Sequence, residues 1–301
     1  MAVILVSNNW HSLLLLDAVK DDPSRVPPSI LHMHAHGHPM MSHSSPSVQL
    51  PRTLARPPFA EVSRDAILAA APELGNVPVE YIRRCLRPKA NEMLSGISSL
   101  PRSQLPTSIP RSQLPTSISV AVQPHHAHPT HVLAVSSSKS PSGNETLAIF
   151  PVHSIVLASH CASLPRLPSS SNAGSTVNLP VLPLALPSPA AFSILHQFMY
   201  HHRLHSVLEA LFPLPSAFLH NLSHHTVQST LASGTLLHQL STYLCSSASS
   251  NLTTLTTHAA RVKELWQDMV ALGLHDTELW DTVDLAWEVV LGALNLAAAQ
   301  R

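Results

Sequence analysis

Histidine is the residue with the greatest capacity for chemistry in this sequence, which contains 22 of them. In one cluster, from His32 to His38, every second residue is a histidine. A second cluster comprises His125, His126, His128 and His131. Neutral imidazoles gathered in this way can bind zinc, nickel or copper. A stable structural site, however, needs about four ligands held by a fold, and both clusters lie in proline-rich stretches. We therefore predict no metal ligands.

The adjacent pair His160 and Cys161 is a second chemical possibility, a base beside a nucleophile. Neighbouring residues on a helix point about 100° apart, so these two side chains do not face each other. We expect Cys161 to be a small buried hydrophobic residue. Residues 151–260 contain one carboxylate, Glu209, and the sequence has no nucleophile elbow, phosphate-binding loop or dinucleotide fingerprint. We therefore predict no catalytic residue and no cofactor.

A third feature is a short basic run that comprises Arg83, Arg84, Arg87 and Lys89. Such runs can act as nuclear import signals or nucleic-acid patches. Here Glu80 and Glu92 flank the run, and no aromatic residues alternate with it to stack on bases. We interpret it as a solvated helix face and expect no direct contact with nucleic acid.

Three tryptophans lie near the C-terminal end, at positions 266, 280 and 287. Trp280 and Trp287 are seven residues apart and so share one side of a helix, and Trp266 meets them if the helices fold back at Gly273. Core packing is the expected role. The alternative is an exposed aromatic anchor, because tryptophan is enriched at interface hot spots. The residues we propose as possible partner contacts are Tyr81, Arg83, Arg84, Trp266 and Trp280.

The overall composition favours an intracellular protein. Only 11% of the 301 residues are charged and the formal net charge is zero, so no global field attracts nucleic acid or acidic membrane. The three cysteines are far apart in the sequence, which excludes a disulfide framework and fits a reducing compartment. No apolar run reaches the roughly 18 residues of a membrane-spanning helix. We therefore expect no membrane and no small-molecule substrate.

The chain divides into five predicted regions. Residues 1–58, rich in proline and histidine, are expected to be largely disordered. Residues 59–98 form a short helical motif, and residues 99–129 a proline-rich linker in which positions 101–109 recur unchanged at 110–118. That repeat is shorter than the roughly 20–50 residues of a solenoid unit. A folded domain over residues 130–250 and a C-terminal helical extension over residues 251–301 complete the prediction.

Residue patterns in the second half predict a hairpin followed by helices. Strands are expected at 131–135 and 146–150, a buried helix at 154–161, and a short strand at 177–179 before a proline-rich bend. Apolar periodicity then predicts helices over residues 190–200, 204–212, 218–231, 236–245, 252–272 and 277–298.

Several long strings in the sequence carry a resemblance to a known family. One is Pro72-Glu-Leu-Gly-Asn-Val-Pro-Val-Glu-Tyr-Ile-Arg-Arg-Cys-Leu-Arg-Pro-Lys-Ala-Asn-Glu-Met-Leu94, and others span residues 150–161, 182–192, 267–272 and 285–294. These strings resemble the clampless-type proteins of basidiomycete fungi. The resemblance implies a regulator of sexual development that acts with mating-type transcription factors to control clamp formation and the dikaryotic cell cycle.

A more distant similarity concerns the fold. Residues 150–161, 177–179 and 191–200 are similar to the BTB/POZ pattern of a hairpin, a helix opened by a histidine, a third strand and a helix ending in tyrosine. The acidic residue usual at the first strand is missing, because Thr130 and His131 stand there. The similarity implies a core built from six residues: His153, Leu157, Cys161, Phe192, Phe198 and Tyr200. For His153 it implies a helix cap or a buried, hydrogen-bonded ring.

Together these observations predict a mainly helical α+β protein with a small BTB/POZ-like sheet. We expect a non-enzymatic regulator, nuclear in location, that binds transcription factors or a second copy of itself. One alternative is an adaptor for a cullin ubiquitin ligase. Another, from a different class, is a small hydrolase or metal-dependent enzyme.

Overall fold

The structure is a computed structural model that describes residues 5–7, 49–122, 127–139, 145–168, 171–173 and 176–300. Most of the region predicted to be disordered, residues 1–58, lies outside these ranges. The first histidine cluster, His125 and His126 also lie outside them. The predictions for those positions stay predictions.

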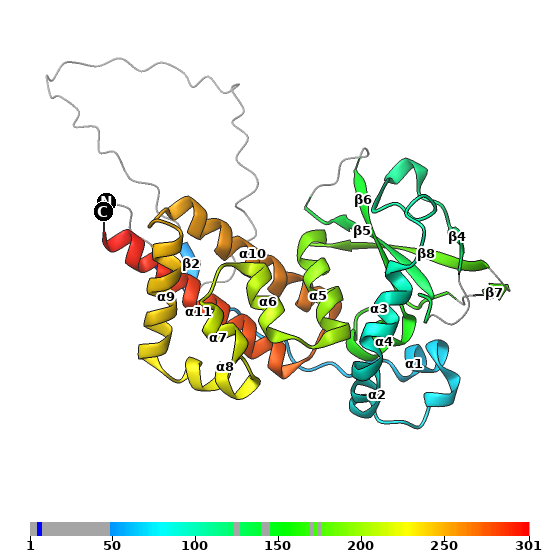
Figure 1. The fold of residues 1–301 in the computed structure, drawn as a ribbon, viewed down its shortest axis with the longest axis horizontal. Helices are drawn as coiled ribbons and strands as arrows, with labels where there is room; N and C mark the ends of the chain where they lie inside the picture. Colours follow the sequence, from blue (N-terminus) through cyan, green and yellow to red (C-terminus); the bar gives the residue numbers. More distant parts are fainter. Residues whose placement is uncertain are drawn as a thin grey trace, which may run out of the picture.

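Helices account for more of the described chain than strands do, which confirms the predicted mainly helical α+β class. The helices are α1 (Arg64–Ala70), α2 (Val79–Leu86), α3 (Ala90–Ser98), α4 (Ser154–His160), α5 (Pro189–His201), α6 (Leu204–Leu211), α7 (Ser216–His220), α8 (His224–Leu231), α9 (Gly234–Ser247), α10 (Leu252–Leu272) and α11 (Thr277–Ala299). In Figure 1 the main sheet lies at one end of an elongated molecule, helices α6 to α11 gather at the other, and α5 lies between them.

The main sheet has six strands among the described residues. They are β3 (Ser108–Pro110), β4 (Ser117–Ala121), β5 (His131–Ser137), β6 (Thr146–Val152), β7 (Ser171–Ala173) and β8 (Thr176–Leu186). The strand order is β3-β6-β5-β8-β4, with β7 also paired to β8. Strands β5 and β6 form the predicted antiparallel hairpin, and β5 pairs in parallel with β8. Elsewhere, β1 (Leu5–Ser7) pairs in parallel with β2 (Gln49–Pro51).

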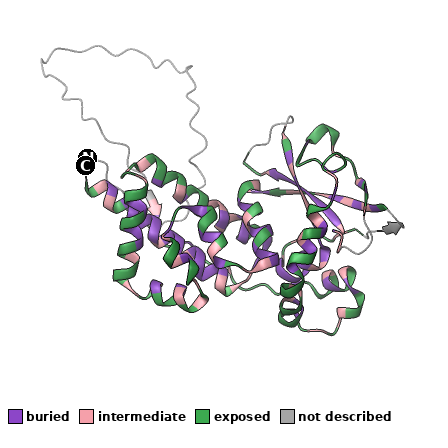
Figure 2. Ribbon diagram, viewed as in Figure 1, coloured by how far each residue is buried: buried purple, intermediate pink, exposed green. Residues whose placement is uncertain are grey.

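Strand β5 is the centre of the sheet and is buried on both faces. Val132 and Ala134 belong to a small core on one face, whereas Leu133 and Val135 belong to the large helical core on the other. Because side chains alternate along a strand, an uninterrupted apolar run is what a doubly covered strand requires. Figure 2 shows this burial continuing into the helical end of the molecule.

The nine-residue duplication is part of the sheet and not the linker predicted for residues 99–129. Its first copy ends in β3, which pairs with β6, and its second copy leads into β4, which pairs with β8. The same isoleucine of each copy, Ile109 and Ile118, is buried in the same small core. The two copies therefore form the two opposite edges of the sheet as short strands, and Pro110 in β3 limits further pairing at that edge.

Strand β8 is longer than the predicted strand at residues 177–179 and replaces the predicted proline-rich bend. Its first half pairs antiparallel with β4 and its second half pairs in parallel with β5. Among the described strands, the second half pairs on one side only. A proline there, Pro183, is tolerated because an edge position needs no donor on its open side.

Helices α1, α2 and α3 fall within the motif predicted for residues 59–98; α1 and α2 pack against α4, and α3 packs against α5. Val62, Ile67, Val79 and Ile82 form a small apolar cluster with Ala158 of α4. Pro78 precedes α2, where its missing backbone N–H costs no hydrogen bond, and Pro88 lies in a 3-10 turn between α2 and α3. Each helix is too short to be stable alone, so this packing on α4 and α5 stabilises the motif.

Residues 50–60 run as an extended strap across α10 and α11, which corrects the prediction of disorder for positions 50–58. Leu54 is buried in the main core. The Trp287 indole N–H donates to the carbonyl of Pro51 at 3.2 Å, and that of Trp266 donates to Ala55 at 2.9 Å. Arg56 pairs with Asp281 and Asp284 of α11. The strap thus covers tryptophans that the sequence left as possible external anchors.

Replacement of Arg56 by alanine is expected to lower the free energy of unfolding by about 1–2 kcal/mol, because two neighbouring carboxylates then lose the cation between them. The matched control is Arg52→Ala, since Arg52 makes one ion pair with Glu288 and its side chain is 55% exposed, against 39% for Arg56. Its expected effect is below about 0.5 kcal/mol. Urea unfolding of both variants measures the difference, and equal effects would contradict this role of the strap.

Helix α11 is the central helix of the C-terminal part, where α6, α8, α9 and α10 pack around it. It is long and apolar enough to cross a membrane by length and composition, but 61% of the apolar window is buried inside the fold.

The predicted fold-back at Gly273 is present, because this glycine ends α10 with a φ of 61°. The single helix predicted for residues 218–231 is two helices instead, since Ser223 caps a new helix, α8.

Candidate interaction groove

Helices α5 and α6 form a helical hairpin at the middle of the molecule. Ser188 begins α5 by accepting a hydrogen bond from the backbone N–H of Ala191, and Pro189 occupies the first turn, where no donor is needed. His202 ends the helix in the left-handed conformation, with a φ of 50°. The chain turns there and enters α6 directly after Arg203.

On its inner face, α5 is hydrogen-bonded to the residue that follows strand β6, His153. The His153 backbone N–H donates to the Tyr200 hydroxyl at 3.1 Å, and the hydroxyl lies 2.9 Å from His153 Nδ1. His153 Nε2 lies 3.2 Å from the carbonyl of Ala127, to which it donates, so Nδ1 accepts from Tyr200. A side chain at Gly96 would put its Cβ 1.8 Å from that carbonyl oxygen, which explains the glycine. His153 is therefore the buried, hydrogen-bonded ring that the sequence implied.

Removal of the Tyr200 hydroxyl is expected to cost about 2–3 kcal/mol of folding free energy, because both His153 groups are buried and lose their partner. The variant Tyr200→Phe tests this by urea unfolding. Tyr243→Phe is the control, since that side chain is 43% exposed on α9, and we expect a change within about 0.5 kcal/mol. Equal stability of the Tyr200 variant and the wild type would disprove the network's contribution.

At the corner between α5 and α6, a second chain of histidines links three parts of the fold. His160 Nε2 lies 2.9 Å from Nε2 of His202, and His160 Nδ1 donates to the carbonyl of Val156 at 2.9 Å. His202 Nδ1 is 3.1 Å from an Arg87 nitrogen and 3.5 Å from the Asp276 carboxylate. Burial, and then the neighbouring His202, lowers the pKa of His160 to about 3. This corner holds the left-handed residue in place.

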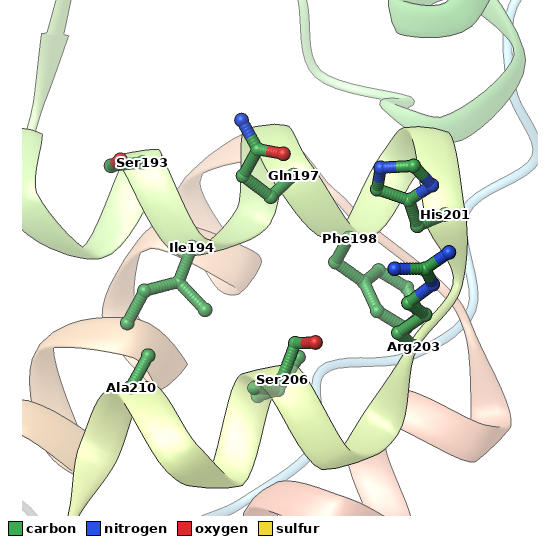
Figure 3. Close-up of a pocket in the computed structure, with 9 residues that line it drawn as sticks. Ser193, Ile194, Gln197, Phe198, His201, Arg203, Ser206 and Ala210 are labelled. Carbon is green, nitrogen blue, oxygen red and sulfur yellow. The ribbon is translucent and has the colours of Figure 1, made fainter. Parts of the chain in front are cut away.

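The outer face of α5 and the facing side of α6 enclose a groove of about 340 Å³, drawn in Figure 3. Ile194 and Phe198 of α5 and Val207 and Ala210 of α6 form its apolar lining. In Figure 3, Ile194 and Phe198 point from α5 toward α6, and Ala210 points from α6 toward α5. The groove is a shallow channel between two antiparallel helices, rimmed by the polar residues Ser193, Gln197, His201, Arg203 and Ser206.

The polar rim has no bonding partner within the described part of the protein. None of these five side chains makes a hydrogen bond or ion pair with another described residue. Burial, together with the Arg203 charge, lowers the pKa of His201, which favours its neutral form. Groups free to bond around an apolar floor are what a partner-binding surface requires, because a partner can satisfy them without breaking internal bonds.

The predicted partner-contact residues lie elsewhere. Tyr81 and Arg84 are exposed on α2, and Tyr81 is 57% exposed. Arg83 is half-buried and donates to the carbonyl of Ser159 at 2.6 Å, so this part of the basic run is not the solvated face predicted. Trp280 is 4% exposed and donates to Leu274, which places it in the core and corrects its assignment as a contact. Trp266 is half-buried beneath the strap.

All six residues assigned to a BTB-like core are buried. Leu157 of α4, Phe192 of α5 and the residues already described lie in the main apolar core, except the polar His153. Their burial fits a core role, although burial alone does not show a BTB fold, and that similarity stays a prediction.

The pair His160 and Cys161 is not arranged as a base and a nucleophile. Burial raises the pKa of Cys161 to about 12, so its thiol stays protonated. Its Sγ contacts Met199 Sδ at 3.7 Å, whereas the His160 ring points to Val156 and His202. Within the described ranges no three His, Cys, Asp or Glu side chains gather in a way that could hold a metal ion.

The rim residues Ser193, Gln197 and Ser206 were missed by sequence reasoning. A signal was present, because Ser193, Gln197 and His201 recur at four-residue steps in the mostly apolar helix α5. This spacing places them on one face of a helix. The facing residues of α6 carry no comparable pattern, and only the fold brings them opposite.

Comparisons with known proteins place the groove in a family context. The family model for the Clampless protein 1 N-terminal domain matches residues 57–187, and that for the Clampless protein 1 C-terminal domain matches residues 205–301. Helix α5 lies in the segment between the two matched regions, and α6 opens the second. The groove is thus formed where the two regions join.

Two curated relatives support the match, both called Clampless protein 1, from strains JEC21 and B-3501A of Cryptococcus neoformans var. neoformans serotype D. Each is 30% identical over 135 residues, which is 44% of this chain and 24% of the relative. The aligned part is therefore about a quarter of the relatives' length. No solved structure matches the chain at comparable significance. From the two family models and these relatives we conclude that this protein belongs to the clampless family.

Proposed function

We propose that this protein is a non-enzymatic regulator of fungal sexual development, which controls clamp-cell formation and the dikaryotic cell cycle by binding other proteins. Membership of the clampless family suggests the role in clamp formation. The observation that carries the binding mechanism is the α5–α6 groove, with its apolar floor and a polar rim whose side chains bond no other described residue. The proposed partners are mating-type transcription factors or a second copy of the chain, and the proposed location is the nucleus.

A groove of this kind suits docking of a protein segment better than catalysis. Two antiparallel helices with an apolar channel between them form a groove that accepts a side-chain row of a partner helix or strand. The polar rim supplies orientation, while the floor supplies burial of apolar surface. In the pair of residues nearest to a catalytic arrangement, burial keeps the Cys161 thiol protonated and makes the neutral His160 ring a poor base, because it raises the pKa of the first and lowers that of the second.

The decisive experiment blocks the groove without disturbing the core. Ala210 is exposed and lines the groove, so Ala210→Arg fills the channel at little expected cost in stability. Ala260→Arg is the matched control, because Ala260 is also an exposed alanine on a helix, α10, away from the groove. Both variants are introduced into a clampless-deletion strain that forms clamps again when the wild-type chain is expressed.

We expect the control to restore clamp cells and Ala210→Arg to fail, with both proteins present at wild-type level and melting at the same temperature. Full restoration by Ala210→Arg would reject the groove as the functional surface.

Affinity capture with the same two variants identifies the partner that no longer binds when the groove is blocked. A transcription factor supports the proposal, whereas a cullin favours the adaptor alternative. A fluorescent fusion that stays outside the nucleus throughout mating would reject the proposed location.

A further inference from the structure

We infer that the α5–α6 groove binds an acidic, apolar peptide segment of a partner protein, with a carboxylate of the segment held by Arg203. This inference rests on the proposed function, in which the groove is a docking surface. It adds the chemistry of the partner, which follows from the charges and shape of the groove.

The formal charge of the residues that line the groove is of one sign, positive. Among its nine lining residues Arg203 carries the single formal charge, and none is a carboxylate. The Arg203 guanidinium forms no ion pair or hydrogen bond with another described residue. Guanidinium groups bind carboxylates through paired, parallel hydrogen bonds, so an unpaired arginine beside an apolar channel selects an acidic group.

Arg87 and Asp276 lie 3.1 Å and 3.5 Å from the same ring nitrogen of the preceding residue, His202, so their opposite charges offset each other and Arg203 sets the charge at this end of the groove. At the opposite end, Glu209 is exposed next to Ala210 but does not line the groove. An acidic group of a bound segment is therefore attracted to the Arg203 end, which gives the segment one preferred direction.

The dimensions fit a short segment. Arg203 and Ala210 are seven residues apart on a helix, a separation of about 10 Å, which corresponds to roughly two helical turns of a partner. Ile194, Phe198 and Val207 form the floor along this length. A segment with two apolar side chains on one face and an acidic residue at the Arg203 end satisfies both requirements.

The test uses three fluorescent 14-residue helical peptides with the full chain. The first carries leucines on one face and glutamates beside them, the second has lysine for each glutamate, and the third has serine for each leucine. Fluorescence anisotropy measures the binding of each peptide. We expect the acidic, leucine-bearing peptide to bind most tightly and its affinity to fall as salt rises. A preference for the lysine peptide, or equal binding of the serine peptide, would overturn the inference.

Two variants locate the effect. Arg203→Glu is expected to weaken the acidic peptide at least tenfold and to strengthen the lysine peptide, because the sign of the rim charge reverses. Arg166→Glu makes the same change in net charge at an exposed arginine outside the groove, and we expect no change in affinity. Equal effects of the two variants would show a non-specific charge effect and reject Arg203 as the anchor.

Failure of this inference and failure of the proposed function give different results. If Ala210→Arg abolishes clamp restoration while the peptides show no acidic preference, the groove functions with a partner of other chemistry. If the acidic peptide binds through Arg203 but Ala210→Arg still restores clamps, the groove binds acidic segments as inferred, but this binding is not needed for clamp formation.

Discussion

Acidification from pH 7 to pH 5 is expected to destabilise the folded protein steeply. Burial lowers the pKa of His153 and of His196 to about 4 and that of His160 to about 3. In the unfolded chain each group takes up a proton below about pH 6.5. The stabilisation is therefore complete above pH 6.5 and is lost as the pH falls from there toward the folded-state values. Over this range each histidine lowers the free energy of unfolding by about 1.4 kcal/mol for each pH unit of acidification, and the three together lower it by about 4 kcal/mol per pH unit.

Urea unfolding at pH 7.5, 6.5 and 5.5 measures this dependence. The variant His196→Gln keeps a donor for the Pro151 carbonyl, which His196 Nε2 contacts at 3.2 Å, but does not titrate. We expect it to reduce the acid slope by about 1.4 kcal/mol per pH unit, the contribution of one histidine. His238→Gln, at an exposed position on α9, is the control and should leave the slope unchanged. A wild-type stability that does not vary over this range would contradict burial of neutral rings.

Replacement of Asp268 by asparagine is expected to stabilise the protein at neutral and alkaline pH. The Asp268 side chain is fully buried on α10, and one of its oxygens accepts from the backbone N–H of Ser188 at 3.0 Å. The other oxygen has no hydrogen-bond partner among the described residues. Burial, and to a lesser degree the nearby Glu264, raises the pKa of Asp268 to about 7. Ionisation of this group therefore opposes folding.

The sign of this effect is opposite to that of the histidines. A raised carboxyl pKa means that the folded protein keeps a proton that the unfolded chain releases above about pH 4. Stability is lost as the pH rises from there to about 7, by up to about 4 kcal/mol. Asparagine keeps the acceptor for Ser188 without ionising, so its advantage grows by about 1.4 kcal/mol per pH unit up to pH 7.

Melting temperatures at pH 5.5, 6.5 and 7.5 test the prediction against Asp65→Asn, an exposed carboxylate in the first turn of α1. The control should differ from the wild type by a constant amount at all three values. If the Asp268 variant also differs by a constant amount, or is less stable at pH 7.5, the assigned ionisation is wrong.

Periodicity in the sequence predicted the long elements well. Helices α5, α10 and α11 lie within two residues of their predicted bounds, because each carries a sustained apolar face and a clear start or stop signal. The hairpin of β5 and β6 was equally visible. In contrast, β3, β4 and the strap are short, and their structure depends on distant residues such as Glu145 and Trp287. Local pattern carries no information on such pairing.

The groove was only partly predictable for the same reason. Apolar residues along α5 were correctly expected to be buried, and Phe192 and Tyr200 are. The groove arises from the orientation of α5 against α6, which the left-handed His202 and its contacts determine. Trp280 was assigned to a contact surface because enrichment at interfaces does not distinguish an exposed indole from one whose N–H is satisfied inside the fold.

The duplicated nonapeptide has a consequence for how this protein tolerates genetic change. A perfect tandem repeat is prone to contract during replication, and such a deletion keeps the reading frame. Here the two copies are not redundant, because one borders β6 and the other borders β8. A chain with a single copy would leave one of these strands bare, with an open row of backbone donors and acceptors that can recruit another molecule. Loss of nine residues would therefore produce self-associating protein rather than a shorter working one.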